Sequence, residues 1–89
     1  MPRLSFTPQL KRHVDCPDDA AGGLTVRAAL EDYFGRHPAV RPYVFDEQGE
    51  LRRHVIIFID SEQLKDRATQ SDPLRSDSEL FVMQALSGG

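Results

Sequence analysis

The chain closes with two glycines, Gly88 and Gly89, and these are the residues best suited to chemistry. Glycine lacks a Cβ atom, so its backbone can extend and pass close to the surface of another protein. A terminal glycine also presents its carboxylate without a side chain beside it, which suits a reaction inside a narrow channel of a partner enzyme. We therefore predict that Gly89 is the reacting residue, and that Ser87 and Gly88 belong to the tail that carries it.

The remaining nucleophiles and metal-ligating residues form no recognisable motif. Cys16 has neither a CxxC partner nor a charged cluster that would activate it, which indicates an ordinary cysteine at the end of a strand. The pair Gly22-Gly23 lacks the lysine and the spacing of a phosphate-binding loop. The histidines are too far apart in sequence to suggest a metal site: His13, His37 and His54. The sequence therefore predicts no metal site and no catalytic side chain.

Composition limits the classes of function. Eighty-nine residues suit one domain, here residues 1–86, followed by a short tail at 87–89. A formal net charge of −3 with scattered basic residues argues against general binding to nucleic acid or to an anionic membrane. The longest apolar run, residues 55–59, is far shorter than a membrane span. A single cysteine cannot form an intrachain disulfide, so we expect a cytoplasmic protein.

One helix is the clearest of the elements that must position the tail. Thr25 is a plausible N-cap, Gly35 fits the position just past the end, and Pro38 follows as a stop. Between them, apolar residues recur every three or four positions, which predicts an amphipathic helix over residues 25–35 with one buried face. That face consists of Val26, Ala29, Leu30, Tyr33 and Phe34.

Four strands are predicted around this helix, at residues 3–7, 12–16, 52–59 and 79–86. The first alternates apolar and polar residues and ends at Pro8, and the second is weaker. Residues 60–77 are polar and mostly irregular. The order strand, strand, helix, strand, loop, strand predicts an α+β fold in which a sheet of four to five strands carries the helix on one face.

The two later strands have apolar residues on both sides. In the strand at 52–59, one row contains Val55, Ile57 and Ile59, and the other contains Ile56 and Phe58. If one row packs under the helix, the other forms an exposed apolar patch, which usually marks an interaction site. The alternative is that the long loop at 60–77 buries both faces, although that loop contains little apolar material.

These elements resemble the MoaD/ThiS family of sulfur carriers, which have a ubiquitin-like β-grasp fold. The resemblance is carried by TVRAAL at 25–30, by Pro38, by LRRHVIIFID at 51–60 and by DSELFVMQALSGG at 77–89. It spans nearly the whole chain, and the order of the pieces with the terminal di-glycine makes it specific. The family implies a mixed sheet in which the first and last strands lie adjacent and parallel in the middle.

The resemblance also implies a reaction cycle. An E1-like adenylyltransferase would use ATP and Mg²⁺ to adenylate the Gly89 carboxylate. A sulfur donor would then convert it to a thiocarboxylate, and a synthase would accept the sulfur into a small metabolite. The carrier would bind no cofactor itself and would be a protein cosubstrate, not an enzyme.

The family's open sheet face, extended to this chain, implies a docking patch for these partner enzymes. The patch consists of Ile56, Phe58, Phe81 and Met83. The same assignment places the opposite rows in the core under the helix, together with Leu4 and Phe6: Val55, Ile57, Ile59, Leu80 and Val82.

The pathway and the fate of the tail stay open at the level of sequence. Molybdopterin carriers commonly end in Pro-Pro-Val-x-Gly-Gly, whereas this chain reads QALSGG over residues 84–89. A carrier for cysteine, methionine or a thiolated secondary metabolite fits at least as well as one for molybdopterin or thiamin. The main alternative function is a protein modifier joined through Gly89 to a lysine of a target. A weaker alternative is a ubiquitin-like binding module whose tail is unused.

Overall fold

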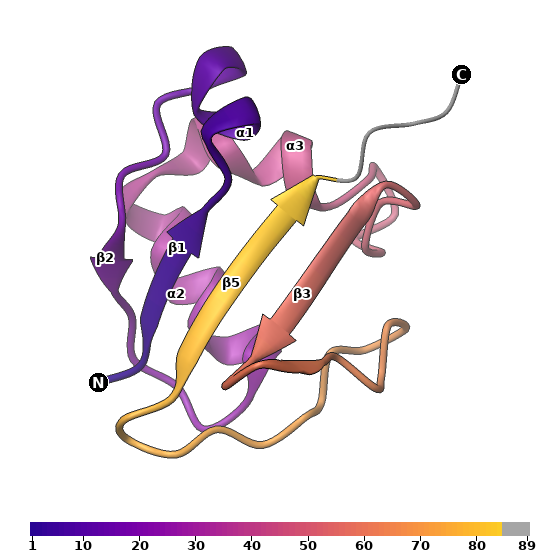
Figure 1. Cartoon of the computed structure of the whole chain (residues 1–89). Coiled ribbons are helices and arrows are strands. Elements are labelled where there is room, and N and C mark those ends of the chain that lie inside the picture. Colours follow the sequence, from indigo (N-terminus) through magenta and orange to yellow (C-terminus); the bar gives the residue numbers. More distant parts are fainter. Residues whose placement is uncertain (85–89) are drawn as a thin grey trace.

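A mixed sheet with one long helix across its back forms the fold, and the computed structural model describes residues 1–84 (Figure 1). In chain order the elements are β1 (Arg3–Phe6), α1 (Pro8–His13), β2 (Asp19–Ala20), α2 (Val26–Arg36), a 3-10 turn η1 (Pro38–Val40), α3 (Arg41–Val44), β3 (Val55–Ile59), β4 (Glu62–Gln63) and β5 (Glu79–Gln84).

The five strands lie in the order β2-β1-β5-β3-β4. β1 and β5 are parallel neighbours in the middle of the sheet, and the other neighbouring pairs are antiparallel. The predicted α+β fold with adjacent, parallel first and last strands is therefore confirmed. The outer strands β2 and β4 contain two residues each, so the edges of the sheet are short, which limits pairing with other chains.

The core lies between the sheet and α2. The five residues of the predicted helix stripe are all at most 4% exposed. Along the strands every second residue is buried, as expected when one face packs against a helix. The buried strand residues are Leu4, Phe6, Val55, Ile57, Leu80 and Val82, and Ile59 packs against them with partial exposure. The predicted inward rows are therefore confirmed.

The strand predicted at residues 12–16 is wrong. Residues Pro8–His13 form the short helix α1, and the second strand is β2, further along the chain. Proline suits the first position of a helix because the N–H that it lacks would have no partner there. Leu10 is the residue that α1 buries, so a single apolar anchor fixes this helix to the domain. Cys16 consequently lies in a loop rather than at the end of a strand.

The predicted start of α2 is confirmed and its predicted end is one residue short. The hydroxyl of Thr25 accepts a hydrogen bond from the amide of Ala28 at 3.2 Å. Gly35 lies within the helix, which ends at Arg36 with His37 as its C-cap. Gly35 does not take the left-handed conformation of a terminating glycine, and the helix continues until the Pro38 turn begins.

The loop before β5 caps the N-terminus of α2 with backbone hydrogen bonds. The first two helical amides, those of Val26 and Arg27, donate to the carbonyls of Asp72 at 3.0 Å and Gln70 at 2.9 Å. Such amides have no partner within the helix, so this loop satisfies two donors that would otherwise need water. Gln70 is fully buried, and its side chain accepts a hydrogen bond from the guanidinium of Arg27 at 2.9 Å. The region at 60–77 is thus mostly irregular, as predicted, but packed.

Two aspartates hold this loop in shape. The carboxylate of Asp66 accepts hydrogen bonds from the amides and hydroxyls of Thr69 and Ser71. These bonds, with the Ser71 hydroxyl first among them, lower the pKa of Asp66 well below its ordinary range. The carboxylate of Asp72 accepts from the amides of Lys65 and Asp66 at 2.9 Å each. The ionised form of Asp66 offers acceptor sites for all four of its bonds to Thr69 and Ser71.

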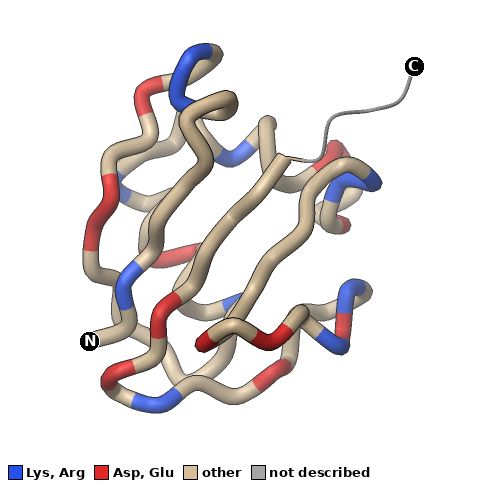
Figure 2. The backbone as a smooth tube through the Cα atoms, viewed as in Figure 1, with Lys and Arg blue, Asp and Glu red and all other residues tan. Residues whose placement is uncertain are grey.

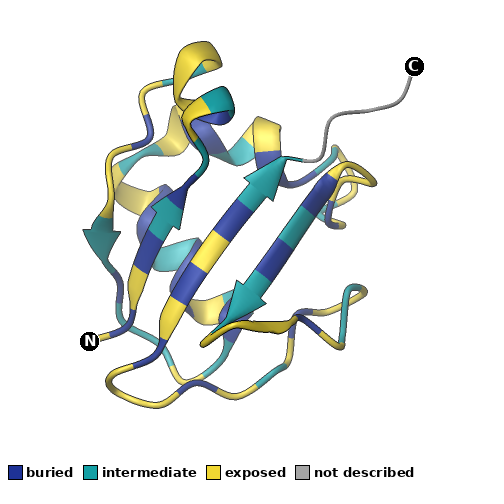
Figure 3. Ribbon diagram, viewed as in Figure 1, coloured by how far each residue is buried: buried dark blue, intermediate teal, exposed yellow. Residues whose placement is uncertain are grey.

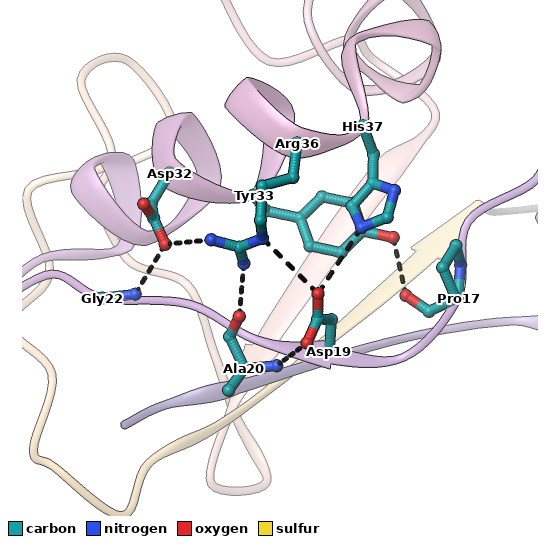
Figure 4. A network of polar contacts seen from close by, with 8 residues as sticks. All are labelled: Pro17, Asp19, Ala20, Gly22, Asp32, Tyr33, Arg36 and His37. Carbon is teal, nitrogen blue, oxygen red and sulfur yellow. Dashed lines mark hydrogen bonds and ion pairs between the residues drawn. The ribbon is translucent and has the colours of Figure 1, made fainter.

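A second network fastens the segment around β2 to α2 (Figure 4). The hydroxyl of Tyr33 donates to the carbonyl of Pro17 at 2.6 Å, and burial raises the pKa of Tyr33, which keeps the donor protonated. Arg36 donates to the carbonyl of Ala20 at 2.5 Å and lies 3.5 Å from the carboxylate of Asp19. The amide of Ala20 is the main group that lowers the pKa of Asp19. These contacts hold the β2 segment against α2.

Candidate docking face and carrier tail

Four apolar side chains occupy the side of β3 and β5 that α2 does not cover. In the antiparallel register, Ile56 pairs with Met83 and Phe58 pairs with Phe81. Phe81 is 36% exposed and the other three are partly buried, whereas their sequence neighbours on both strands face the core. Figure 3 shows this alternation of buried and more exposed residues along both strands. We call these four side chains the apolar quartet.

Polar residues frame the apolar quartet on the same face. Ser5 of β1 pairs with Phe81, and Gln63 of β4 pairs with Phe58. One step towards the start of β5, Arg3 pairs with Glu79. Figure 2 shows that β3 and β5 carry charge only at this Glu79, so the middle of the face is uncharged. Sequence reasoning missed this polar frame, because only the register of the strands reveals which residues lie beside the quartet.

The loop at 60–77 does not bury both faces of the sheet. Its apolar residues Leu64 and Leu74 belong to the same core as α2. A two-residue turn at Asp60 and Ser61, with positive φ angles of 50° and 75°, joins β3 to β4. Such turns match the right-handed twist of a hairpin. The chain then returns to the core side and leaves Phe81 exposed.

The base of the tail is braced from a neighbouring loop. β5 ends at Gln84, which pairs with Val55 at the start of β3. The guanidinium of Arg67 donates to the carbonyls of Val55 at 2.8 Å and Arg52 at 3.0 Å. Arg67 was not among the sequence-predicted residues, and no local pattern marks it. Its bonds fix the strand against which the last described residues of β5 pair.

The predicted reacting residue and its tail, Ser87, Gly88 and Gly89, lie outside the described residues, as do the last two positions of the strand predicted at 79–86. Their roles stay predictions.

The structure also shows the surroundings of the other residues that could act as nucleophiles or metal ligands. Cys16 is 1% exposed, and burial raises the pKa of its thiol, so the reactive thiolate form is disfavoured. Within residues 1–84 there is no group of three or more histidine, cysteine, aspartate or glutamate side chains arranged to hold a metal ion. Over the same residues no helix is both long enough and apolar enough to span a membrane.

Known proteins resemble this chain in sequence and in fold. No family model matches the chain. Small archaeal modifier protein 1 of Haloferax volcanii is 32% identical over 71 residues, which cover 80% of this chain and 77% of that protein. The chain belongs to its family, the ubiquitin-like sulfur carriers of the MoaD/ThiS type. The resemblance stated from the sequence is therefore confirmed.

Solved structures of this family superpose on nearly the whole chain. The crystal structure of SAMP1 from Haloferax volcanii has a TM-score of 0.78 at 26% identity, covering 99% of this chain and 98% of that one. In the Amycolatopsis orientalis BexX/CysO complex, a chain matches with a TM-score of 0.82 at 20% identity, covering all of both chains. Mycobacterium tuberculosis CysO matches with a TM-score of 0.80 at 18% identity, covering 97% of this chain and all of that one. These likenesses support the β-grasp fold.

Proposed function

We propose that this member of the family is a sulfur carrier that works through the carboxylate of Gly89. An E1-like enzyme, using ATP and Mg²⁺, joins the carboxylate to AMP with loss of pyrophosphate. The outer sulfur of a persulfide donor then attacks the carbonyl carbon and AMP leaves. A thiol next attacks the inner sulfur, which breaks the S–S bond, releases the donor as a disulfide and leaves the thiocarboxylate. A synthase takes the sulfur into a small metabolite. The chain is a cosubstrate in this cycle and holds no cofactor.

One arrangement supports this function most directly. The strand that carries Phe81 and Met83 on the uncovered face is also the strand that leads to Gly88 and Gly89. Five residues follow Gln84, and a fully extended stretch of that length reaches at most about 17 Å. For a partner enzyme that binds the apolar quartet, the active site must therefore lie within about 17 Å of Gln84, the distance that the extended tail can span.

The apolar quartet supplies the kind of surface that such a partner needs. Apolar and aromatic side chains near the centre of an interface contribute most of the binding energy, and a polar rim excludes water around them. Ile56, Phe58, Phe81 and Met83 provide the apolar centre, and the residues of the polar frame provide the rim. We therefore propose that the activating enzyme docks on this face. A related β-grasp protein has been crystallised in the BexX/CysO complex.

A second function shares the activation step. The relative from Haloferax volcanii is called a modifier protein, and a modifier would transfer the activated Gly89 carboxyl to a lysine of a target protein. The carrier and the modifier differ only in the nucleophile that displaces AMP. The carrier uses sulfur, and the modifier uses an amine. The product identifies the function.

Intact-mass measurement tests the carrier function. The full chain is incubated with its E1-like enzyme, ATP, Mg²⁺ and a sulfur donor. We expect the mass to rise by the replacement of one oxygen with one sulfur, and the variant lacking Gly89 to stay unchanged. Activation, seen as release of pyrophosphate, without any sulfur-containing product would contradict the carrier function. Attachment to lysines of added target proteins would instead establish the modifier.

A further inference from the structure

The last residues of β5 have a neighbouring strand on one side only, as far as residues 1–84 show. The pairing of β5 with β1 ends at Val82, opposite Phe6, because the chain then turns into α1. The pairing of β5 with β3 continues to Gln84, which lies opposite Val55. Among the described residues, Val55 is therefore the strand neighbour that holds the final position of β5.

Arg67 holds Val55 from the outer edge of β3. Its guanidinium group donates to the carbonyl of Val55 at 2.8 Å and to that of Arg52 at 3.0 Å. The amide of Val55 also donates to the carbonyl of Arg52 at 3.0 Å, so Arg67 bonds to both ends of the turn that leads into β3. A guanidinium group presents its donors in a rigid planar fork, which lets one side chain fix two carbonyls relative to each other. Within the described residues β4 pairs only with Phe58 and Ile59, so Arg67 occupies a place that no strand fills.

Gln70 connects Arg67 to the main helix. Its side-chain amide donates to the carbonyl of Arg67 at 2.6 Å, and its side-chain oxygen accepts from the guanidinium of Arg27 on α2 at 2.9 Å. Gln70 is fully buried and has a φ angle of 53°. A residue with a Cβ atom is uncommon in this left-handed conformation and persists there only where the surrounding contacts hold it. A chain of side-chain hydrogen bonds thus runs from α2 through Gln70 and Arg67 to Val55.

The position of Gln84 matters because of the proposed function, on which this inference rests. In that function the enzyme binds the apolar quartet, and the reacting carboxyl group is joined to the quartet through Met83 and Gln84. If Val55 moved away, the end of β5 would lose its strand neighbour and the geometry between the docking surface and the reacting group would vary. A misplacement of about 1 Å can lower a reaction rate about a hundredfold.

We propose that Arg67 is a positioning residue for the carrier reaction. By holding Val55 it fixes the end of β5, and with it the point from which the chain continues towards its reacting end. Its contribution is to the rate of activation and not to docking, because its bonds go to backbone carbonyls at the start of β3 and not to the side chains of the apolar quartet.

Hydrogen exchange of backbone amides, resolved by NMR on the full chain, tests the structural part without any partner. Arg67→Ala should make the amides of residues 82–84 exchange about tenfold faster while those of residues 79–81 keep their wild-type rates, because the opening is local. Arg67→Lys keeps the charge but lacks the fork, so it should lie between the two, and it provides the comparison if Arg67→Ala does not fold. Arg53→Ala is the matched control, since Arg53 is exposed, lines the same open groove as Arg67 and carries the same charge. It should behave as wild type.

Pyrophosphate release by the E1-like enzyme, measured over a range of carrier concentrations, tests the functional part. Arg67→Ala should lower kcat about tenfold and leave the KM for the carrier within about twofold of wild type, with partial recovery in Arg67→Lys. A variant that only lowered the folded fraction would instead raise the apparent KM and keep kcat, because the molecules that stay folded would react normally.

Two results would overturn the proposal. One is exchange that is unchanged in Arg67→Ala, or accelerated equally along all of β5. The other is a wild-type kcat in Arg67→Ala despite faster exchange at residues 82–84. If the wild-type chain released no pyrophosphate with its enzyme, the proposed function would fail, and the exchange measurement would still decide whether Arg67 fixes the end of β5.

Discussion

Two neighbouring residues of β3 provide a severe test of which face of the sheet is open. Ile57 is fully buried beneath α2 and pairs with Val82. Phe58 belongs to the apolar quartet on the opposite face and is only partly buried. A shift of the strand by one residue would exchange the two faces. We therefore compare Ile57→Asp with Phe58→Asp, the same new residue at adjacent positions.

The structure gives very different costs for the two changes. Ile57→Asp removes a buried side chain worth about 1.5–3 kcal/mol of burial free energy. It also places a carboxylate in the core without a partner, which costs several kcal/mol more. The sum approaches the whole free energy of unfolding of a small domain, about 5–15 kcal/mol. Phe58→Asp puts the carboxylate at a solvated surface, where substitutions usually change stability by no more than about 0.5 kcal/mol.

Thermal denaturation followed by circular dichroism measures the first effect. We expect Ile57→Asp to be unfolded or nearly so, and Phe58→Asp to melt close to wild type. Binding to the activating enzyme measures the second effect, and Phe58→Asp should weaken it sharply, because a charge in an apolar interface loses water without gaining a partner. Met83→Asp should behave in the same way. An unfolded Phe58→Asp beside a folded Ile57→Asp would refute the assignment of faces, and unchanged binding would refute the docking site.

Three further changes test the parts that hold the face in place. Leu30→Ala should lower the free energy of unfolding by about 2–5 kcal/mol in urea denaturation, because Leu30 is fully buried on α2; a loss below about half a kcal/mol would show that it does not pack there. Thr25→Ala should cost about 1 kcal/mol in the same assay, since it removes the side-chain acceptor for the Ala28 amide, whereas Thr25→Ser should restore most of it. The lowered pKa of Asp66 means that its ionised form stabilises the fold in full above the ordinary carboxyl pKa of about 3.9, and that this stabilisation is lost as the pH falls towards the lower folded value. Denaturation midpoints of wild type should therefore fall between about pH 5 and pH 2 more steeply than those of Asp66→Asn, and parallel curves would contradict this role.

The main helix could be predicted from the sequence because its signal is local and repetitive. The stripe on α2 repeats through three turns, whereas β5 has apolar residues on both faces, so its pattern alone does not identify the inward row. The family resemblance added the parallel pairing of β1 with β5, which no local pattern specifies. It also supplied the choice between the two apolar rows, which composition alone left open.

The errors arose where a single contact decides the structure. α1 has one buried residue, Leu10, so it lacks the repeated pattern that identifies a helix. Glycine is common just past the end of a helix, so Gly35 was expected to end α2. The helix instead continues to Arg36, and Pro38 begins the next turn. The contacts of Gln70 and Arg67 join loops far apart in the sequence, and they could be found only from the fold.

The central claim is that the Gly89 carboxyl carries sulfur, and the C-terminal peptide of the protein isolated from its own host tests it most directly. Arg75 is the last trypsin site, so digestion releases residues 76–89 as one peptide. The carrier function predicts that a fraction of this peptide has one oxygen replaced by sulfur, located by fragmentation at Gly89. That fraction should disappear when the E1-like enzyme is deleted. A peptide found only as the free acid in cells that actively make the sulfur-containing metabolite, or only attached to lysines of other proteins, would contradict it.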